Sequence, residues 1–326
     1  MNPARREILQ LLAGAAALPA LASSARAQAW PARPVRIIVP FQPGGSTDIF
    51  ARLAAQKLTE HFGKQFYVEN IAGATGNVGT AQAARAAPDG YTLLIAFSSY
   101  VVNPTLFAKL AFDPDRDFAP VTLAVASLNV IIVNPSLPAR DLKELVALIK
   151  ANPGKYSYAT GGVGTQSHLL GEMLRLSLGL DIVHVPFNGA APAVASAVAG
   201  HTPIALATVA SAAQALEAKQ LRALAVASKK RSQLLFDVPT TAEAGYPQIE
   251  GDSWVGLLAP AGTPREIIGA VRDEIASILE SPDVKERLPS LGFEVVASTP
   301  EDFGHRIKVE TETWGKVVRA ANIKAE

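Results

Sequence analysis

Strand-like and helix-like segments alternate along the chain from residue 35 to residue 96. Apolar runs over Val35 to Pro40, Phe66 to Glu69 and Thr92 to Ala96 predict strands. The segments between them, Asp48 to Phe62 and Gly76 to Ala86, predict helices, and apolar residues recur at helical spacing in the first of these. Because strands and helices take turns in this way, the pattern predicts a parallel sheet with helices on both faces.

A second alternating block runs from Val130 to Val226, and the segment after Thr263 is predicted to be helical. Two long extended stretches, Ala119 to Asn134 and Ser253 to Pro260, lie near the two ends of that block. Strands in these positions are suited to cross between two lobes, because each joins the first block to the second.

The chain is long enough for two hydrophobic cores. After residue 27, 299 of the 326 residues remain, and single cores stop growing beyond roughly 250–300 residues. We expect a discontinuous first lobe of residues 28–128 and 252–326, and a second lobe of residues 129–251. The predicted fold class is therefore α/β, with two α/β lobes and a ligand cleft between them.

Residues 1–27 predict an export signal. Arg5 and Arg6 precede an uncharged apolar run from Ile8 to Leu21, and Ala25-Arg26-Ala27 has the pattern of a cleavage site. The apolar run is shorter than the roughly 20 residues that a membrane-spanning helix needs, so we expect no direct insertion into the membrane. The expected location is the periplasm, reached by the Sec route or, because of the paired arginines, by the twin-arginine route.

Composition removes several classes of function. The formal net charge of +1 becomes −1 once the three arginines and one glutamate of residues 1–27 are removed. No basic excess therefore indicates binding to nucleic acid. The chain has no cysteine, which excludes disulfides, thiolate metal sites and a cysteine nucleophile. We expect neither a metal nor a cofactor.

The sharpest local signal is the segment FQPGGSTD, from Phe41 to Asp48, between a predicted strand and a predicted helix. Glycines allow the backbone to approach a ligand closely, and free N–H groups at a helix start favour an anion. The alternative is an ordinary tight turn in which Ser46 or Thr47 caps the helix. Asp48 would repel an anion brought too close, so we interpret it as a structural or water-mediated group.

A second glycine-rich segment, Tyr158 to His168, also leads into a predicted helix. No Gly-Lys-Ser/Thr follows its glycines, so it is not a phosphate-binding P-loop. One such helix start in each half of the chain predicts a ligand held between two lobes. Gly73 to Gly79 is interpreted as a helix-opening loop that borders the cleft, and Ser98 and Ser99 follow a strand where open α/β sheets place ligands.

Patterns that would indicate catalysis are weak. The five histidines show no HExxH spacing, and the chain has no G-x-S-x-G elbow. Ser98 or Thr165 with His168 is the only candidate pair of nucleophile and base. His184 is interpreted as a satisfied core histidine. We therefore expect that the protein is not an enzyme.

A set of short motifs occurs in order along almost the whole chain after residue 27. They are Arg33 to Phe41 with Pro43-Gly44-Gly45 and Asp48, Glu69-Asn70, Gly73 with Gly76-Asn77, Pro88 to Leu94, Gly164-Thr165 with His168, His184 to Gly189, Leu221 to Val226, Val238 to Thr240, Glu243 to Gly245 and Ala259 to Pro264. This ordered set resembles the tripartite tricarboxylate transporter substrate-binding proteins, also called Bug or TctC-like receptors.

The resemblance implies a periplasmic-binding-protein type II fold whose lobes close on the ligand. It also implies that the loop Pro43 to Asp48 and the helix start Gly164 to His168 grip one ligand carboxylate, partly through bridging waters. The apolar stretch Thr202 to Ala210 offers nothing to receive an ammonium group, which favours a di- or aromatic carboxylate over an amino acid. The residues expected to bind the ligand are Phe41, Gln42, Pro43, Gly44, Gly45, Ser46, Thr47, Asp48, Ala74, Ser98, Ser99, Gly164, Thr165, Gln166, His168, Phe187, Asn188, Gly189 and Thr208.

The predicted function is that of a monomeric periplasmic solute-binding protein. It would capture a small organic carboxylate and deliver it to the membrane components of a tripartite transporter. Two alternatives remain: a ligand-sensing receptor for a signalling partner, and a secreted hydrolase.

Overall fold

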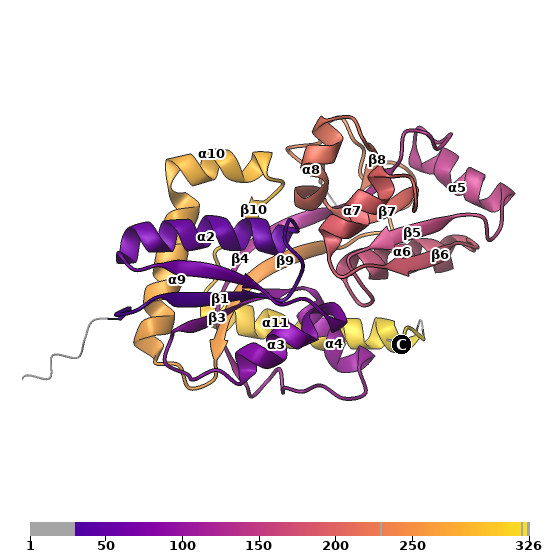
Figure 1. Cartoon of the computed structure of the whole chain (residues 1–326). Helices are drawn as coiled ribbons and strands as arrows, with labels where there is room; N and C mark the ends of the chain where they lie inside the picture. The colour runs from indigo at the N-terminus through magenta and orange to yellow at the C-terminus, as the bar shows by residue number, and fades with distance from the viewer. Residues whose placement is uncertain (1–29, 229, 321, 325–326) are drawn as a thin grey trace, which may run out of the picture.

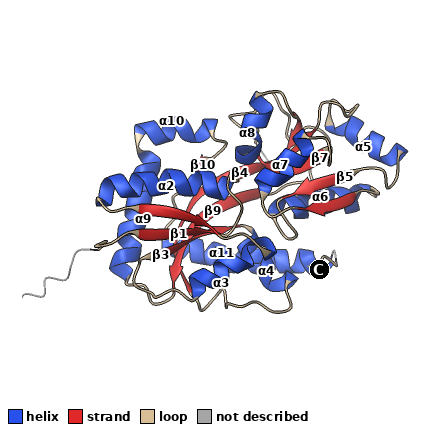
Figure 2. Ribbon diagram, viewed as in Figure 1, coloured by secondary structure: helices blue, strands red, loops and turns tan. Residues whose placement is uncertain are grey.

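The computed structural model describes residues 30–228, 230–320 and 322–324, so the predicted export signal lies outside the described residues. The chain folds into two α/β lobes side by side (Figures 1 and 2). In the described part of the chain, no helix combines the length and the apolar character needed to cross a membrane.

The sheet of the first lobe has the strand order β2-β1-β3-β9, continued by β4. The first three strands are parallel to one another and β9 is antiparallel to β3. β1 and β3 are made almost entirely of buried residues, because helices cover both faces of the sheet. The bounds are β1 (Val35–Val39), β2 (Phe66–Asn70), β3 (Thr92–Phe97), β4 (Phe118–Val133) and β9 (Asp252–Pro260).

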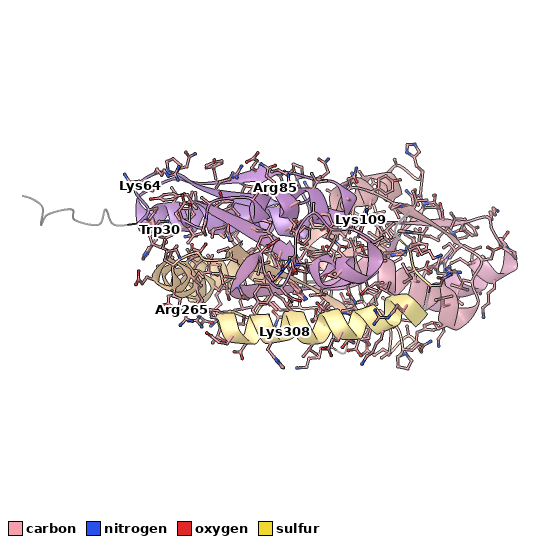
Figure 3. All side chains as sticks on the ribbon, turned by 90° about the horizontal axis from the view of Figure 1, so that it is seen from below. Trp30, Lys64, Arg85, Lys109, Arg265 and Lys308 are labelled. Carbon is pink, nitrogen blue, oxygen red and sulfur yellow. The ribbon has the colours of Figure 1, made fainter. Side chains whose placement is uncertain are left out.

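Two layers of helices cover this sheet. One face packs against α2 (Ser46–Phe62), α9 (Arg265–Glu280) and α10 (Pro282–Ser290) in a core around Phe50 and Ile275. The other face packs against the short 3-10 helix η2 (Ala74–Gly76), α3 (Asn77–Ala84), α4 (Ser99–Leu106) and α11 (Pro300–Ala320). Figure 3 shows α11 along the underside of this lobe, with Lys308 on it.

The second lobe repeats this architecture with shorter strands. Its sheet has the order β7-β5-β6, and both β7 and β8 pair with the end of β4. The strands are β5 (Ser157–Thr160), β6 (Val183–Pro186), β7 (Ile204–Thr208) and β8 (Arg222–Val226). Helices α5 (Leu142–Ala151) and α6 (Gln166–Leu178) pack on one face, and α7 (Ala190–Val198) and α8 (Val209–Glu217) on the other.

One long strand belongs to both sheets. β4 pairs with β9 as far as Leu128, and from Asn129 onward it pairs with β7. The short strand β10 (Glu294–Val295) also pairs with the first half of β4. The two predicted extended stretches are therefore strands β4 and β9, and β4 runs directly from one lobe into the other (Figure 1).

Candidate functional site

A small cavity of about 30 Å³ lies between the two lobes. Its walls carry hydroxyl groups, two aromatic rings and backbone, and they include no charged side chain. The lining residues are Phe41, Gly45, Ser46, Thr47, Phe97, Gly161, Thr165, Ser167, Ala190 and Thr208.

Four helices begin at this cavity. The residues before the first turns of α2, α6, α7 and α8 are Gly45, Thr165, Gly189 and Thr208. For each of these helices, that residue or the one after it lines the cavity. The first N–H groups of a helix have no acceptor within that helix, and the helix dipole makes its N-terminus positive. The cavity therefore favours an anion without using a charged side chain.

Helix α2 begins differently from the alternative interpretation, in which Ser46 or Thr47 caps it. Gly45, not Ser46 or Thr47, occupies the N-cap position, and it provides no side-chain cap. Ser46 and Thr47 lie in the first turn and line the cavity. The backbone N–H of Ser46 donates to Ser211 Oγ of α8 at 3.1 Å. The first N–H of α2 therefore binds the other lobe and not a local cap.

Asp48 is buried and bound within its own lobe. Its carboxylate accepts hydrogen bonds from the backbone N–H of Gly44 at 3.0 Å, from Arg52 Nε at 3.0 Å and from Asn70 Nδ2 at 2.9 Å. Burial by itself raises the pKa of Asp48, but these hydrogen bonds and the Arg52 charge outweigh it and hold the pKa below its ordinary value. Asp48 thus holds the Gly44-Gly45 turn in place and does not line the cavity.

Helix α6 begins with a side-chain cap at Thr165. Its Oγ1 accepts from the backbone N–H of His168 at 3.4 Å and donates to the carbonyl of Gly162 at 2.8 Å. The same hydroxyl lies 3.0 Å from Ser167 Oγ. Gly162 and Gly164 have φ angles of +133° and +82°, a region that favours glycine. The predicted glycine-rich helix start is therefore a tight loop that brings two hydroxyls to the cavity.

His168 and His184 lie on the other side of this loop, away from the cavity. Their rings stack with centroids 4.1 Å apart, and both line a separate groove of about 620 Å³. His184 is half-buried in the groove wall, so its prediction as a core histidine is wrong, although Thr160 Oγ1 lies 2.7 Å from its Nε2. Burial lowers the pKa of His168 to about 4. Burial and the neighbouring His168 lower the pKa of His184 to about 3.

The two lobes also contact each other directly. The backbone N–H of Gln42 donates to the carbonyl of Asn188 at 3.3 Å, and Ser46 N–H reaches Ser211 Oγ as described above. The two lobes are therefore in direct contact beside a cavity of about 30 Å³.

The structure distributes the predicted ligand-binding residues over three places. Phe41, Gly45, Ser46, Thr47, Thr165 and Thr208 line the cavity. Ala74 and His168 line the large groove, Gln42 and Pro43 line a third groove at the surface, and Phe187 and Asn188 line both of these grooves. The remaining predicted residues, Gly44, Asp48, Ser98, Ser99, Gly164, Gln166 and Gly189, line none of the three.

Four lining residues are absent from the sequence-based set: Phe97, Gly161, Ser167 and Ala190. Each is the immediate chain neighbour of a predicted residue or of the glycine run that was singled out. Phe97 ends β3, and parallel strands present their carboxyl ends to ligands. Extending the predicted set by one residue in each direction would have included Phe97, Ser167 and Ala190, while Gly161 would have needed the whole segment Tyr158 to His168.

The geometry gives the candidate nucleophile and base no catalytic contact. The His168 ring accepts the backbone N–H of Gly164 through Nδ1 at 3.0 Å. Thr165 contacts His168 through the backbone N–H and not through that ring nitrogen. Among the described residues, no group of three His, Cys, Asp or Glu side chains is placed to hold a metal ion.

Residues 50–323 match a protein family described as "Tripartite tricarboxylate transporter family receptor". The UPF0065 protein in the tcbD-tcbE intergenic region of Pseudomonas sp. (strain P51) is 39% identical over 321 residues, which are 97% of this chain and 94% of that protein. Protein BugT of Bordetella pertussis is 36% identical over 306 residues, covering 93% of this chain and 94% of BugT.

Solved structures share the fold at similar coverage. A structure described as a periplasmic transporter is 44% identical, with a TM-score of 0.88 over 91% of this chain and 99% of that one. R. palustris Rpa4515 with adipate is 33% identical, with a TM-score of 0.88 and coverage of 90% and 99%. MatC of Rhodopseudomonas palustris with bound malate is 32% identical, with a TM-score of 0.84 and coverage of 89% and 100%.

Proposed function

Because this chain belongs to the tripartite tricarboxylate transporter receptor family, we propose that it is a periplasmic solute-binding protein for a small organic carboxylate. The ligand would be held between the two lobes at the cavity lined by Ser46, Thr47 and Thr165. The protein would carry the ligand and not transform it. The observation that carries this proposal is the meeting of four helix N-termini at one uncharged cavity.

The chemistry of the cavity fits a carboxylate. Its walls supply hydroxyl groups and helix-terminal N–H groups, both of which donate hydrogen bonds to carboxylate oxygens. Neutral donors bind an anion without a buried arginine beside it, so the bound state is not held by a strong ion pair. That suits a carrier that has to release its cargo to a membrane partner.

We further infer a preference for di- or aromatic carboxylates over amino acids. An α-ammonium group needs an acceptor, commonly a carboxylate, and no Asp or Glu side chain lines the cavity. The nearby Asp48 carboxylate already accepts three hydrogen bonds from its own lobe. The similarity to structures that hold adipate and malate supports the same preference.

Export and domain boundaries complete the proposal. Residues 1–27 would direct the chain to the periplasm and be removed, and the mature protein would act as a monomer with the membrane components of a tripartite transporter. The first lobe would comprise residues 28–128 and 252–326, and the second residues 129–251. The change of partner strand along β4, between Leu128 and Asn129, supports the boundary at that position.

The test is thermal unfolding of the mature protein with malate, adipate, citrate, benzoate, aspartate and glutamate, each in excess. A ligand that binds only the folded state stabilises it by about 2.7 kcal/mol at one hundred times Kd. We expect the largest rise in melting temperature with a diacid or an aromatic acid. No rise with any carboxylate would contradict the proposed function, and a larger rise with aspartate than with malate would contradict the ligand class.

A pair of variants locates the site. Thr165→Val removes the hydroxyl that caps α6 at the cavity, whereas Asp141→Ala removes the cap of α5, where the Asp141 side chain accepts from Glu144 N–H. Both changes remove one N-cap, so both should destabilise the ligand-free protein by about 1 kcal/mol. Only Thr165→Val should also lose the ligand-induced rise, and an undiminished rise in that variant would place the ligand elsewhere.

A further inference from the structure

Three rings form a stack directly behind the loop that begins α6. The His168 and His184 centroids are 4.1 Å apart with the planes at 26°, and the Tyr158 ring lies 5.0 Å from His184 at 31°. Gly171 makes room for this stack, since a Cβ atom there would lie 2.2 Å from Tyr158 Cε2. The stack thus spans β5, β6 and α6 and gives the loop a rigid backing.

Two members of the stack bind the loop itself. His168 Nδ1 accepts the backbone N–H of Gly164 at 3.0 Å. His184 Nε2 lies 2.7 Å from Thr160 Oγ1, which also accepts the backbone N–H of Gly162 at 3.3 Å. Each histidine is therefore linked to one of the two glycines whose positive φ angles shape the loop.

These contacts require His168 to be uncharged. A nitrogen that accepts a hydrogen bond carries no proton, so His168 holds its single ring proton on Nε2. The charged and titratable groups around the stack are Glu172 and Arg175 on α6, Tyr158 on β5, and Lys324, which lines the same groove. Glu172 accepts from Tyr158 OH at 2.8 Å and pairs with Arg175 at 2.7 Å, so its charge is largely balanced.

From this geometry we propose that His168 and His184 are positioning residues for ligand capture. As neutral imidazoles they hold the loop from Thr160 to Thr165 in the shape that presents the start of α6 to the cavity. The inference rests on the proposed function for its effect on affinity, but not for its effect on the loop. Both rings line the groove and not the cavity, which distinguishes this role from the direct contact expected of His168 in the sequence.

Protonation of His168 has a defined consequence. It converts the Nδ1 acceptor into a donor that faces the N–H of Gly164, and two donors repel each other. Since the pKa of His168 is about 4, the loop should keep its shape across the neutral range and lose it as the pH falls toward 4. Because His168 does not change its protonation near neutral pH, it should cause no change in ligand affinity there.

Two substitutions test separately the two properties of His168, its hydrogen-bond acceptor and its stacking ring. His168→Phe keeps a ring to stack on His184 but has no acceptor, whereas His168→Asn places an amide oxygen near the Nδ1 position and cannot titrate. Losing one buried hydrogen bond costs about 1–1.5 kcal/mol, which corresponds to roughly tenfold in Kd. By calorimetry with malate and adipate at pH 7.5, we expect about tenfold weaker binding for His168→Phe and near-normal binding for His168→Asn. His201→Phe, at an exposed histidine, is the control and should leave Kd unchanged.

The second measurement needs no ligand. The backbone amide resonance of Gly164, followed by NMR from pH 7.5 to 3.5, should shift with a midpoint near 4 in the unsubstituted protein and stay flat in His168→Asn. A flat profile in the unsubstituted protein, or unchanged affinity in a folded His168→Phe, would overturn the proposal. If malate and adipate fail to bind the unsubstituted protein, the proposed function fails for these diacids, and the Gly164 profile decides the positioning role alone.

Discussion

At the scale of single residues, Asp48 shows how a charge next to an anion site can help the site. Its carboxylate is buried, but it faces Gly44, Arg52 and Asn70 and not the cavity. By accepting the N–H of Gly44 it fixes the turn that leads into α2. The sequence-based interpretation of Asp48 as a structural group agrees with these contacts, while its part in binding the ligand stays a prediction.

Asp48→Asn should destabilise the fold at pH 7 by roughly 1–3 kcal/mol, because the amide NH₂ would face one of three existing donors. The pKa of Asp48 is lowered in the folded state, so its ionised form contributes stability above the unfolded pKa and loses it as the pH falls through the folded pKa. The difference between variant and unsubstituted protein in urea unfolding should therefore shrink from pH 7 to pH 3. An equal difference at both pH values would contradict this account.

At the scale of one element, helix α6 depends on a glycine in its interior. Glycine is a poor helix former, yet Gly171 lies in the middle of Gln166–Leu178. The reason is tertiary, since Tyr158 of β5 packs against the helix backbone at that position. Tyr158 is itself buried and donates its hydroxyl to Glu172 of the same helix, so it has little room to move.

Gly171→Ala is expected to destabilise the protein by about 1–3 kcal/mol, because the new methyl group would overlap the Tyr158 ring. Gly269→Ala is the matched control. Gly269 also lies inside a helix, α9, but a Cβ atom there meets nothing within 4 Å, so the change should stabilise by roughly 0.5–1 kcal/mol. Urea unfolding measures the free energy of unfolding of both variants. If both substitutions change it in the same direction, the contact with Tyr158 does not determine the cost at Gly171.

The elements were largely predictable, whereas their meeting points were not. Apolar runs such as Val35–Val39 and Thr92–Phe97 identify strands, because a strand buried on both faces consists almost entirely of apolar residues. The alternative interpretation of the segment before α2 made Ser46 or Thr47 the N-cap, whereas Gly45 takes that position and the Ser46 N–H binds Ser211, 165 residues further along the chain. The starts of α7 and α8 also reach the cavity through contacts between residues far apart in the chain. Only the packed lobes bring those helix starts to α2 and α6.

At the scale of the whole molecule, α4 of the first lobe contacts the loop before α6 of the second. Gly164 faces Leu106, and a Cβ atom added to the glycine would lie 2.1 Å from Leu106 Cδ1. Leu106 is buried in the core of the first lobe. Any side chain at position 164 therefore has to displace Leu106 or hold the lobes apart.

Gly164→Ala should weaken diacid binding by tenfold or more and reduce the ligand-induced compaction seen by small-angle X-ray scattering. The expected loss combines a strained positive φ with a wedge between lobes, each costing on the order of 1–2 kcal/mol. Gly63→Ala supplies the control, because Gly63 has φ of +64° but meets nothing within 4 Å. It should lose only the roughly 1–2 kcal/mol of the strained φ and keep both affinity and compaction. Normal compaction in Gly164→Ala would rule out the wedge.

The place of β9 in the first sheet sets an order of events during synthesis. β9 lies between β3 and β4, yet residues 252–260 follow the whole second lobe in the chain. As the chain leaves the ribosome or the export channel from its N-terminus, β4 has no β9 to join it to β3 until the second lobe has emerged. We expect the second lobe, which appears later, to complete its sheet first, and the first lobe to remain open until residue 260 is free.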